Sequence, residues 1–280
     1  MKISVTHSTV YRYNCAVDLG PHTLRLRPRM TNTQRLIAYS IRIFPLPVGT
    51  TECLDQDGNL SLYAWFGPPT QEFNVCSDFT VEMARGNPFD FILNEDALNV
   101  PLSYPEPLGA ALATYRDTSN VSDAVQRFAH GIAADTGWRT LPFLDALNAR
   151  LFQNSNHVTR PEGLPYSSQL TLTLMEGSCR DLAVLFCDAS RAMGFAARFV
   201  SGYECAAAGQ VGSYMHAWAE VYIPNAGWRG YDPSRGLAVS NGHVAVAGGF
   251  NYDLAAPISG SFIGGSESAM NANIQMWVHP

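Results

Sequence analysis

The stretch GSCRDLAVLFCDASRAMGF, residues 177–195, contains the strongest helix signal in the sequence. Ser178 and Asp181 have the spacing of a capping box, in which two side chains satisfy backbone groups at the start of a helix. Gly194 stands where a helix typically ends, because glycine readily adopts the left-handed conformation found there. Apolar side chains recur between these positions at steps of three and four residues and predict one buried stripe: Leu182, Leu185, Phe186, Ala189 and Met193.

The predicted helix carries two cysteines in different surroundings. Cys179 lies at its start, whereas Cys187 lies about two turns further in. A thiol attacks as a thiolate, and the unpaired N–H groups and the dipole of a helix N-terminus favour negative charge. Cys187 lacks this advantage. A lone helical cysteine is usually a small buried hydrophobic residue, so Cys179 is a candidate nucleophile only if a base lies nearby.

Three predicted strands follow the helix, at residues 196–204, 214–223 and 227–236, with a hairpin turn at 224–227. In the second strand, alternation places His216 on one face together with Trp218. If the second and third strands pair through the hairpin, Asp232 lies beside the early part of the His216 strand. His216 would then take the thiol proton, and Asp232 would hold the imidazole in the required tautomer. Each residue alone has a structural interpretation, since Asp before Pro favours turns, but the combination favours a cysteine–histidine–aspartate site.

Residues 1 to about 110 read as a β region. Alternating segments are separated by turn signals such as DQDGN at 55–59, which predicts a sandwich-like domain with strands near 2–13, 24–30, 34–44, 61–66 and 76–84. We therefore predict two domains, 1–110 and 111–280, joined by a linker at 101–109. Helical spacing within 119–135 and 141–152 places two further helices in the second domain, the first capped by Ser119, Asn120 or Ser122.

Composition narrows the class of protein. The chain of 280 residues is 46% hydrophobic and 15% charged, with a net charge of −6, which argues against disorder and against a nucleic-acid-binding surface. No segment approaches the roughly 20 apolar residues of a membrane span, and the N-terminus lacks the apolar core of a signal peptide. The six scattered cysteines show no metal-ligand spacing. We expect a soluble cytoplasmic protein with free thiols, no metal and no cofactor, and with neither nucleic acid nor membrane as a partner.

Several motifs resemble one family. The segments at 177–203, 216–236 (HAWAEVYIPNAGWRGYDPSRG) and 242–247 (GHVAVA) are similar to the core of the bacterial transglutaminase-like superfamily. The N-terminal YRYN and HTLRLRPR resemble the β-rich region that often precedes that core. The resemblance implies an α+β, papain-like fold, with Cys179 as nucleophile, His216 as general base and Asp232 as its orienting partner. The sequence departs from many relatives at 248–253, where an Arg-Asp pair is expected.

The resemblance and the candidate triad together predict a cysteine-dependent acyl-transfer enzyme. It would act on peptide or glutamine-type amide bonds in a protein or peptide substrate through a thioester, most readily as a hydrolase. The alternatives are a protein-glutamine transglutaminase and a non-catalytic binding or assembly protein that keeps the fold. The backbone N–H of Cys179 is one expected oxyanion donor, and Gln169 or Tyr166 is a candidate for the second. His243 either faces the site or caps a strand, and the second interpretation is favoured.

Overall fold

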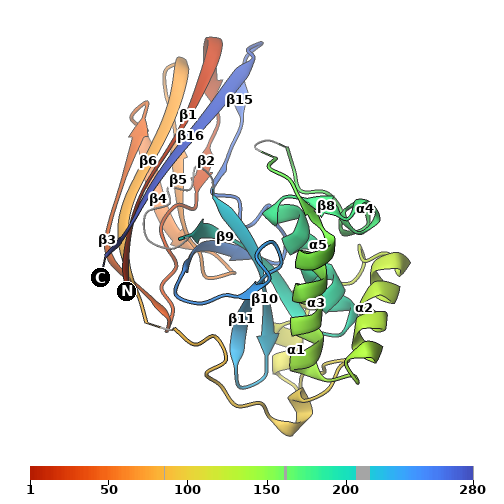
Figure 1. Cartoon of the computed structure of the whole chain (residues 1–280). Coiled ribbons are helices and arrows are strands. Elements are labelled where there is room, and N and C mark those ends of the chain that lie inside the picture. Colours follow the sequence, from red (N-terminus) through yellow and green to blue (C-terminus); the bar gives the residue numbers. More distant parts are fainter. Residues whose placement is uncertain (85, 161–162, 206–214, 280) are drawn as a thin grey trace.

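The N-terminal alternation forms two antiparallel sheets, visible at the upper left of Figure 1. The computed structural model describes residues 1–84, 86–160, 163–205 and 215–279. In the first sheet the strand order is β15–β1–β6–β3, and β16 also pairs with β1; the strands are β1 (Lys2–Leu19), β3 (Gln34–Phe44), β6 (Thr70–Met83), β15 (Phe262–Ile263) and β16 (Ser268–His279). The second sheet has the order β14–β2–β5–β4, with β2 (His22–Leu24), β4 (Gly49–Leu54), β5 (Leu60–Trp65) and β14 (Ile258–Ser259).

The two sheets share one apolar core. Burial alternates along β6, as expected for a strand with one face turned inward. The enclosed side chains come from both sheets: Tyr13, Val17, Leu19, Leu24, Leu26, Leu62, Phe73 and Val75. This is the sandwich-like packing that the alternating segments predicted.

The strand predicted at 24–30 is wrong beyond its first residue, because β2 ends at Leu24. The chain leaves the sheet here to contact the rest of the molecule. The backbone N–H of Arg29 donates to the carbonyl of Ala245 at 3.0 Å, and its guanidinium donates to Asn59 Oδ1 at 2.7 Å. The contact with Ala245 joins segments far apart in the sequence, so no local pattern indicates it.

The last strand joins the N-terminal sheet. β16 runs antiparallel to β1 from the pair Lys2–His279 to the pair Tyr13–Ser268. The sequence assigned these residues to the second domain, 111–280, whereas β16 pairs with β1 in the N-terminal sheet. The division of the chain at residue 110 stays a prediction.

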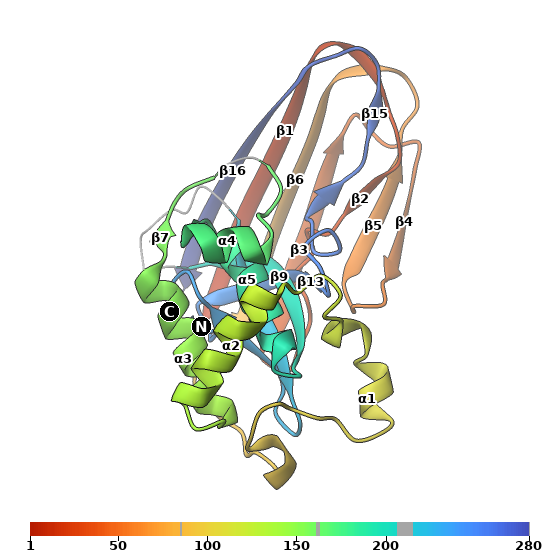
Figure 2. The ribbon, with the colours of Figure 1, turned by 90° about the vertical axis from the view of Figure 1, so that its right-hand side faces the viewer.

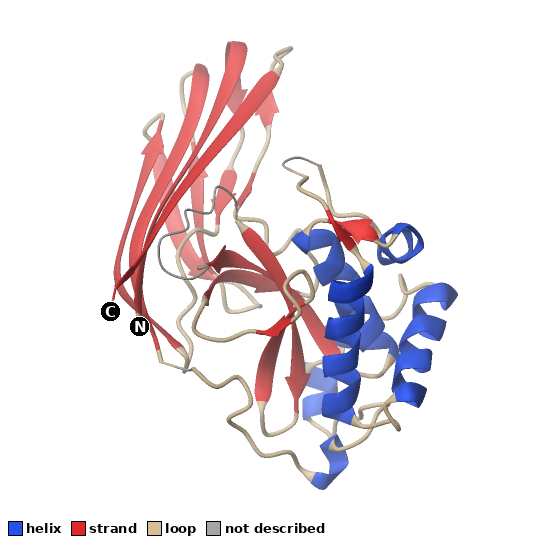
Figure 3. Ribbon diagram, viewed as in Figure 1, coloured by secondary structure: helices blue, strands red, loops and turns tan. Residues whose placement is uncertain are grey.

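The rest of the chain forms an antiparallel sheet of order β12–β11–β10–β9–β13, covered by helices on one side (Figures 2 and 3). Its strands are β9 (Ala196–Glu204), β10 (His216–Ile223), β11 (Gly227–Asp232), β12 (Leu237–Ala238) and β13 (His243–Gly249). The helices are α1 (Leu108–Ala111), α2 (Asp123–Asp135), α3 (Thr140–Asn154), α4 (Ser168–Leu174) and α5 (Cys179–Ala192). Short elements complete the chain: η1 (Glu95–Ala97), η2 (Thr114–Arg116), β7 (Asn156–His157) and β8 (Glu176–Gly177). Residue 214, the predicted start of the second strand, lies outside the described residues, and α4 was not predicted.

Helix α5 is the central helix of this half, as residues 177–195 predicted. Its apolar stripe is buried in a core shared with α2, α3 and the sheet. The helix ends at Ala192, and Gly194, just beyond it, has a φ of +82° and lies against the Leu102 backbone. A Cβ at this position would come within 2.3 Å of the Leu102 carbonyl oxygen, so both the conformation and the space require glycine.

The two halves meet along β13, the edge strand of the sheet β12–β11–β10–β9–β13. The side-chain amide of Gln34 donates to the carbonyl of Ala245 and accepts from its N–H, both at 2.9 Å. Asn59 makes the same pair of bonds with Gly248, both at 2.8 Å. The two amides thus satisfy backbone groups that an edge strand would otherwise leave unpaired. No helix in the described part of the chain is long and apolar enough to cross a membrane.

Candidate active site

The N-terminus of α5 is held by one buried carboxylate. Asp181 Oδ2 accepts hydrogen bonds from the backbone N–H and the hydroxyl of Ser178, both at 2.7 Å. Its Oδ1 accepts from the Arg160 guanidinium at 2.6 Å and from the Tyr166 backbone N–H at 2.7 Å. Burial alone would raise the pKa of Asp181, but these bonds outweigh it and the pKa is lowered. The ionised carboxylate therefore fixes the first turn of the helix, where Cys179 lies.

The two cysteines of α5 differ as the sequence predicted. Cys179 is partly buried and lines a cleft. Cys187 is buried inside the core, and burial raises its pKa to about 12. A thiol in such surroundings is inert, so the cleft-facing cysteine is the candidate nucleophile.

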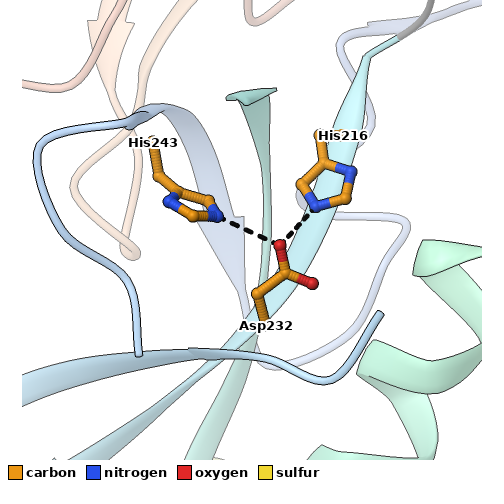
Figure 4. Close-up of side chains that lie close together, drawn as sticks. All are labelled: His216, Asp232 and His243. Carbon is orange, nitrogen blue, oxygen red and sulfur yellow. Dashed lines mark hydrogen bonds and ion pairs between the residues drawn. The ribbon is translucent and has the colours of Figure 1, made fainter. Parts of the chain in front are cut away.

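The structure brings the three predicted residues together. His216, the first residue of β10, lies with its Nε2 at 2.6 Å from Oδ2 of Asp232, the last residue of β11 (Figure 4). The hairpin register produces this contact, because Ala219 pairs with Tyr231 and Asp232 therefore lies beside the start of β10. His216 also shares a hydrogen bond with the Cys179 side chain. Since its Nε2 is occupied by Asp232, Nδ1 is the ring nitrogen left for the thiol.

The His216–Asp232 pair favours charge on both partners. Burial lowers the pKa of His216, but hydrogen bonds to Asp232 and Cys179 outweigh it and raise the pKa above its ordinary value. Burial likewise would raise the pKa of Asp232, and bonds from His216 and His243 lower it instead. Asp232 is fully buried, so its charge acts in surroundings that screen it little.

His243 contacts the same carboxylate, which the favoured strand-cap interpretation did not predict. Its Nε2 lies 3.0 Å from Asp232 Oδ2, as Figure 4 shows. The other carboxylate oxygen, Oδ1, accepts from the backbone N–H and the hydroxyl of Ser234 at 3.0 and 2.7 Å. One ligand atom from each of His216, Asp232 and His243 lies within 4.8 Å of the others, a spacing that could also hold a metal ion. Hydrogen bonding accounts for these contacts, and the expectation that no metal is needed stays a prediction.

The cleft beside Cys179 has a volume of about 590 Å³ and is formed by both halves of the chain. Cys179 and His216 come from the second half, and the facing wall is built by alternate residues of β1 and β16: His7, Thr9, Tyr11, Met270, Ala272 and Ile274. Leu164 also lines the cleft and is 68% exposed, so the cleft opens to solvent. Sequence reasoning missed this wall, because nothing in β1 or β16 indicates what its face contacts.

The cleft has a further histidine that is unsuited to proton transfer. His7 Nδ1 lies 2.7 Å from the Tyr203 hydroxyl, and Nε2 lies 3.0 Å from Thr9 Oγ1. Burial lowers the pKa of His7 to about 4.

Among the described residues that line the cleft, neither Tyr166 nor Gln169 appears, so neither candidate for a second oxyanion donor is supported.

The chain is similar to known proteins over most of its length. Residues 3–82 match the bacterial transglutaminase-like N-terminal region, and residues 126–233 match the transglutaminase-like superfamily. An uncharacterized protein of Mycobacterium tuberculosis is 26% identical over 283 residues, covering 95% of this chain and 89% of that relative. An uncharacterized protein of Mycobacterium leprae is 22% identical and covers 98% of each chain.

A solved structure has the same fold over the whole chain. It is that of a "putative cysteine protease" from Cytophaga hutchinsonii, with a TM-score of 0.73 and 22% identity, and it covers 100% of this chain and 92% of that chain. The matched core has a papain-like α+β fold, as the resemblance implied. With its β-rich N-terminal region and its core both matched, this chain is a member of the bacterial transglutaminase-like superfamily.

Proposed function

We propose that the protein is a cysteine-dependent acyl-transfer enzyme, a transglutaminase-like peptidase or amidase that hydrolyses peptide or glutamine-type amide bonds. The observation that carries this proposal is the hydrogen-bonded series Cys179–His216–Asp232, which opens onto a solvent-accessible cleft. Such a series stores a nucleophile beside its base. A cleft of about 590 Å³ lies within the usual range of ligand sites and is large enough for a short segment of a peptide.

Acylation uses the proposed ion pair between the Cys179 thiolate and the His216 imidazolium. The Cys179 thiolate attacks the amide carbonyl, a C–S bond forms, and negative charge develops on the carbonyl oxygen. The Cys179 backbone N–H at the helix start is positioned to stabilise that charge. The protonated Nδ1 of His216 then gives its proton to the leaving nitrogen as the C–N bond breaks, and ammonia or an amine departs. Asp232 remains ionised and keeps the imidazole ring in place.

Deacylation decides between the two outcomes of this chemistry. Neutral His216 takes a proton from water, the hydroxide attacks the thioester, and the carboxylic acid leaves as the thiolate forms again. An amine in place of water would give a cross-link. Because exposed Leu164 marks a mouth open to solvent, water reaches the thioester without an acceptor site, and we favour hydrolysis.

Product analysis tests the proposal. The protein is incubated with glutamine-containing peptides, with and without a primary amine, and products are identified by mass. Backbone cleavage identifies a peptidase, ammonia release without cleavage identifies an amidase, and amine adducts identify a transglutaminase. The Cys179→Ala variant is the control. If no peptide forms a product while Cys179 labels no faster than Cys187 with a thiol reagent, the protein is a binding module and the proposal fails.

We also propose a cytoplasmic location. The described residues include all six cysteines, and none of them forms a disulfide. Cys15 and Cys53 are exposed thiols, which persist best in a reducing compartment. Cell fractionation with detection of the native chain would test this, and recovery from an oxidising compartment would contradict it.

A further inference from the structure

The Asp232 carboxylate has more donors than a simple triad requires. Ser234 supplies two of them on Oδ1, whereas His216 and His243 both bind Oδ2. The two imidazoles approach from different strands, and their ring centroids lie 6.0 Å apart. Because Asp232 is fully buried and ionised, it can only accept. Both Nε2 atoms therefore carry a proton.

His243 cannot replace His216 as the base. Its Nε2–H is used on Asp232, and its Nδ1 is buried with no hydrogen-bond partner among the described residues. His243 is absent from the described lining of the Cys179 cleft. It lines instead a separate cavity of about 90 Å³, together with Trp218. The ring therefore lies on the far side of the carboxylate from the thiol.

The surroundings hold His243 in one orientation. Its ring packs edge-on against the fully buried Trp218, with centroids 5.3 Å apart and an interplanar angle of 77°. Glu204 pairs with His243 across the β9–β13 register, but its carboxylate binds the Arg235 guanidinium at 2.8 Å. Among the described residues, Asp232 is thus the carboxylate that receives the His243 proton.

We infer that His243 is a positioning residue of this site, whose Nε2–H group holds the Asp232 carboxylate where that carboxylate binds His216. This inference rests on the proposed function, because it assigns His243 a role through the triad. Oδ2 is the oxygen that orients the imidazole, and Ser234 secures only Oδ1. Without the second donor on Oδ2, the carboxylate can tilt about its bond to Cβ and weaken its bond to His216. His243 touches neither thiol nor substrate, so it acts only through Asp232.

Three variants of one position test this inference without a known substrate. The rate of Cys179 alkylation by iodoacetamide is measured from pH 5 to 8 by peptide mapping. His243→Phe keeps a ring but removes the donor, and the rate at pH 6 should fall about tenfold, the loss expected for one hydrogen bond to a charged group. His243→Gln places an amide N–H near the position of Nε2 and should stay within about threefold of the native rate. His243→Asn is too short to reach Oδ2 and should resemble the Phe variant.

A buried histidine elsewhere provides the matched control. His22 is buried in the N-terminal half beside Phe66 and Phe73, and His22→Gln should leave the profile unchanged. Equal profiles for native protein, His243→Phe and His243→Asn would overturn the inference, as would a folded Gln variant as slow as the Phe variant. Should the Phe variant fail to fold, the Gln and Asn pair still decides.

Two further results distinguish a positioning role of His243 from a failure of the proposed function and from metal binding. Slow alkylation of Cys179 in the native protein would remove the proposed function itself, whereas fast alkylation in both native protein and His243→Phe would remove only the role of His243. Stoichiometric zinc in the purified native protein, lost in His243→Gln, would make His243 a metal ligand and would also overturn the inference.

Discussion

Replacing His216 with alanine should change how the reactivity of Cys179 depends on pH. Because the pKa of His216 is raised above 6.5, the imidazolium persists through neutral pH and is lost only as the pH rises through that raised value. If Cys179 and His216 form the proposed ion pair, the alkylation rate should vary less than about threefold between pH 5 and 7. Without His216, Cys179 is an isolated thiol at a helix end. An ordinary cysteine is about 0.03% ionised at pH 5 and about 3% at pH 7, so the variant's rate should rise about a hundredfold.

The slope of the alkylation rate against pH is a sharper readout than the rate at one pH. An ion pair makes the thiolate more abundant but also less nucleophilic, so an absolute rate mixes these two effects. Iodoacetamide labelling under pseudo-first-order conditions, followed by mass analysis of the Cys179 peptide, gives the rate at each pH. His130 is exposed and packs on Trp138 away from the cleft, so His130→Ala should show the native profile. A native rate that rises about tenfold per pH unit, parallel to the His216→Ala variant, would refute the ion pair.

Cys179→Ala should abolish turnover, and adding His216→Ala should cost nothing further, because the pair acts as a unit; additive losses would contradict this. Asp232→Ala should retain more kcat than either variant, since the carboxylate orients the imidazole but bonds to no substrate atom, and a complete loss with intact circular dichroism would count against this ranking. Activity should survive EDTA, and loss that zinc or calcium restores would show a metal requirement. Gly194→Ala should lower the free energy of unfolding by at least about 1–3 kcal/mol, the strain of its φ of +82°, and the clash of the new Cβ with the Leu102 backbone adds to that loss. Gly131→Ala, at an open helical position, should raise it by about 0.5–1 kcal/mol, and denaturant titration of both variants checks the opposite signs.

Two parts of the triad were predictable from local patterns, and the family resemblance indicated that these parts meet. The spacing of Ser178 and Asp181 placed Cys179 at a helix start, and strand alternation with one short hairpin placed Asp232 beside His216. All of these relations span a few residues or one turn. Such stretches can be read from the sequence because capping and hairpin geometry depend on residues that are near neighbours in the chain.

The remaining features depend on pairings between distant segments. His243 and Asp232 are eleven residues apart, but they meet because β13 crosses to the far side of β9 rather than extending the hairpin. Residues 24–30 alternate like a strand, yet Arg29 is drawn to the edge of another sheet. Alternation states which face of a strand is buried, but it does not state which strand or sheet will cover that face.

The pairing of β1 with β16 makes the half that carries the candidate site an insertion within the sandwich rather than an appendage to it. Both ends of the described chain lie in adjacent strands, with Lys2 opposite His279. A single cut between residues 101 and 109 would therefore release neither half, because one fragment would carry β1 and the other β16. The two pieces would stay bound through a ladder from Lys2–His279 to Tyr13–Ser268. Fragments made separately from either side of such a cut are accordingly suited to complementation: the N-terminal one would contribute β1 to the facing wall of the cleft, and the C-terminal one would contribute β16 and the triad.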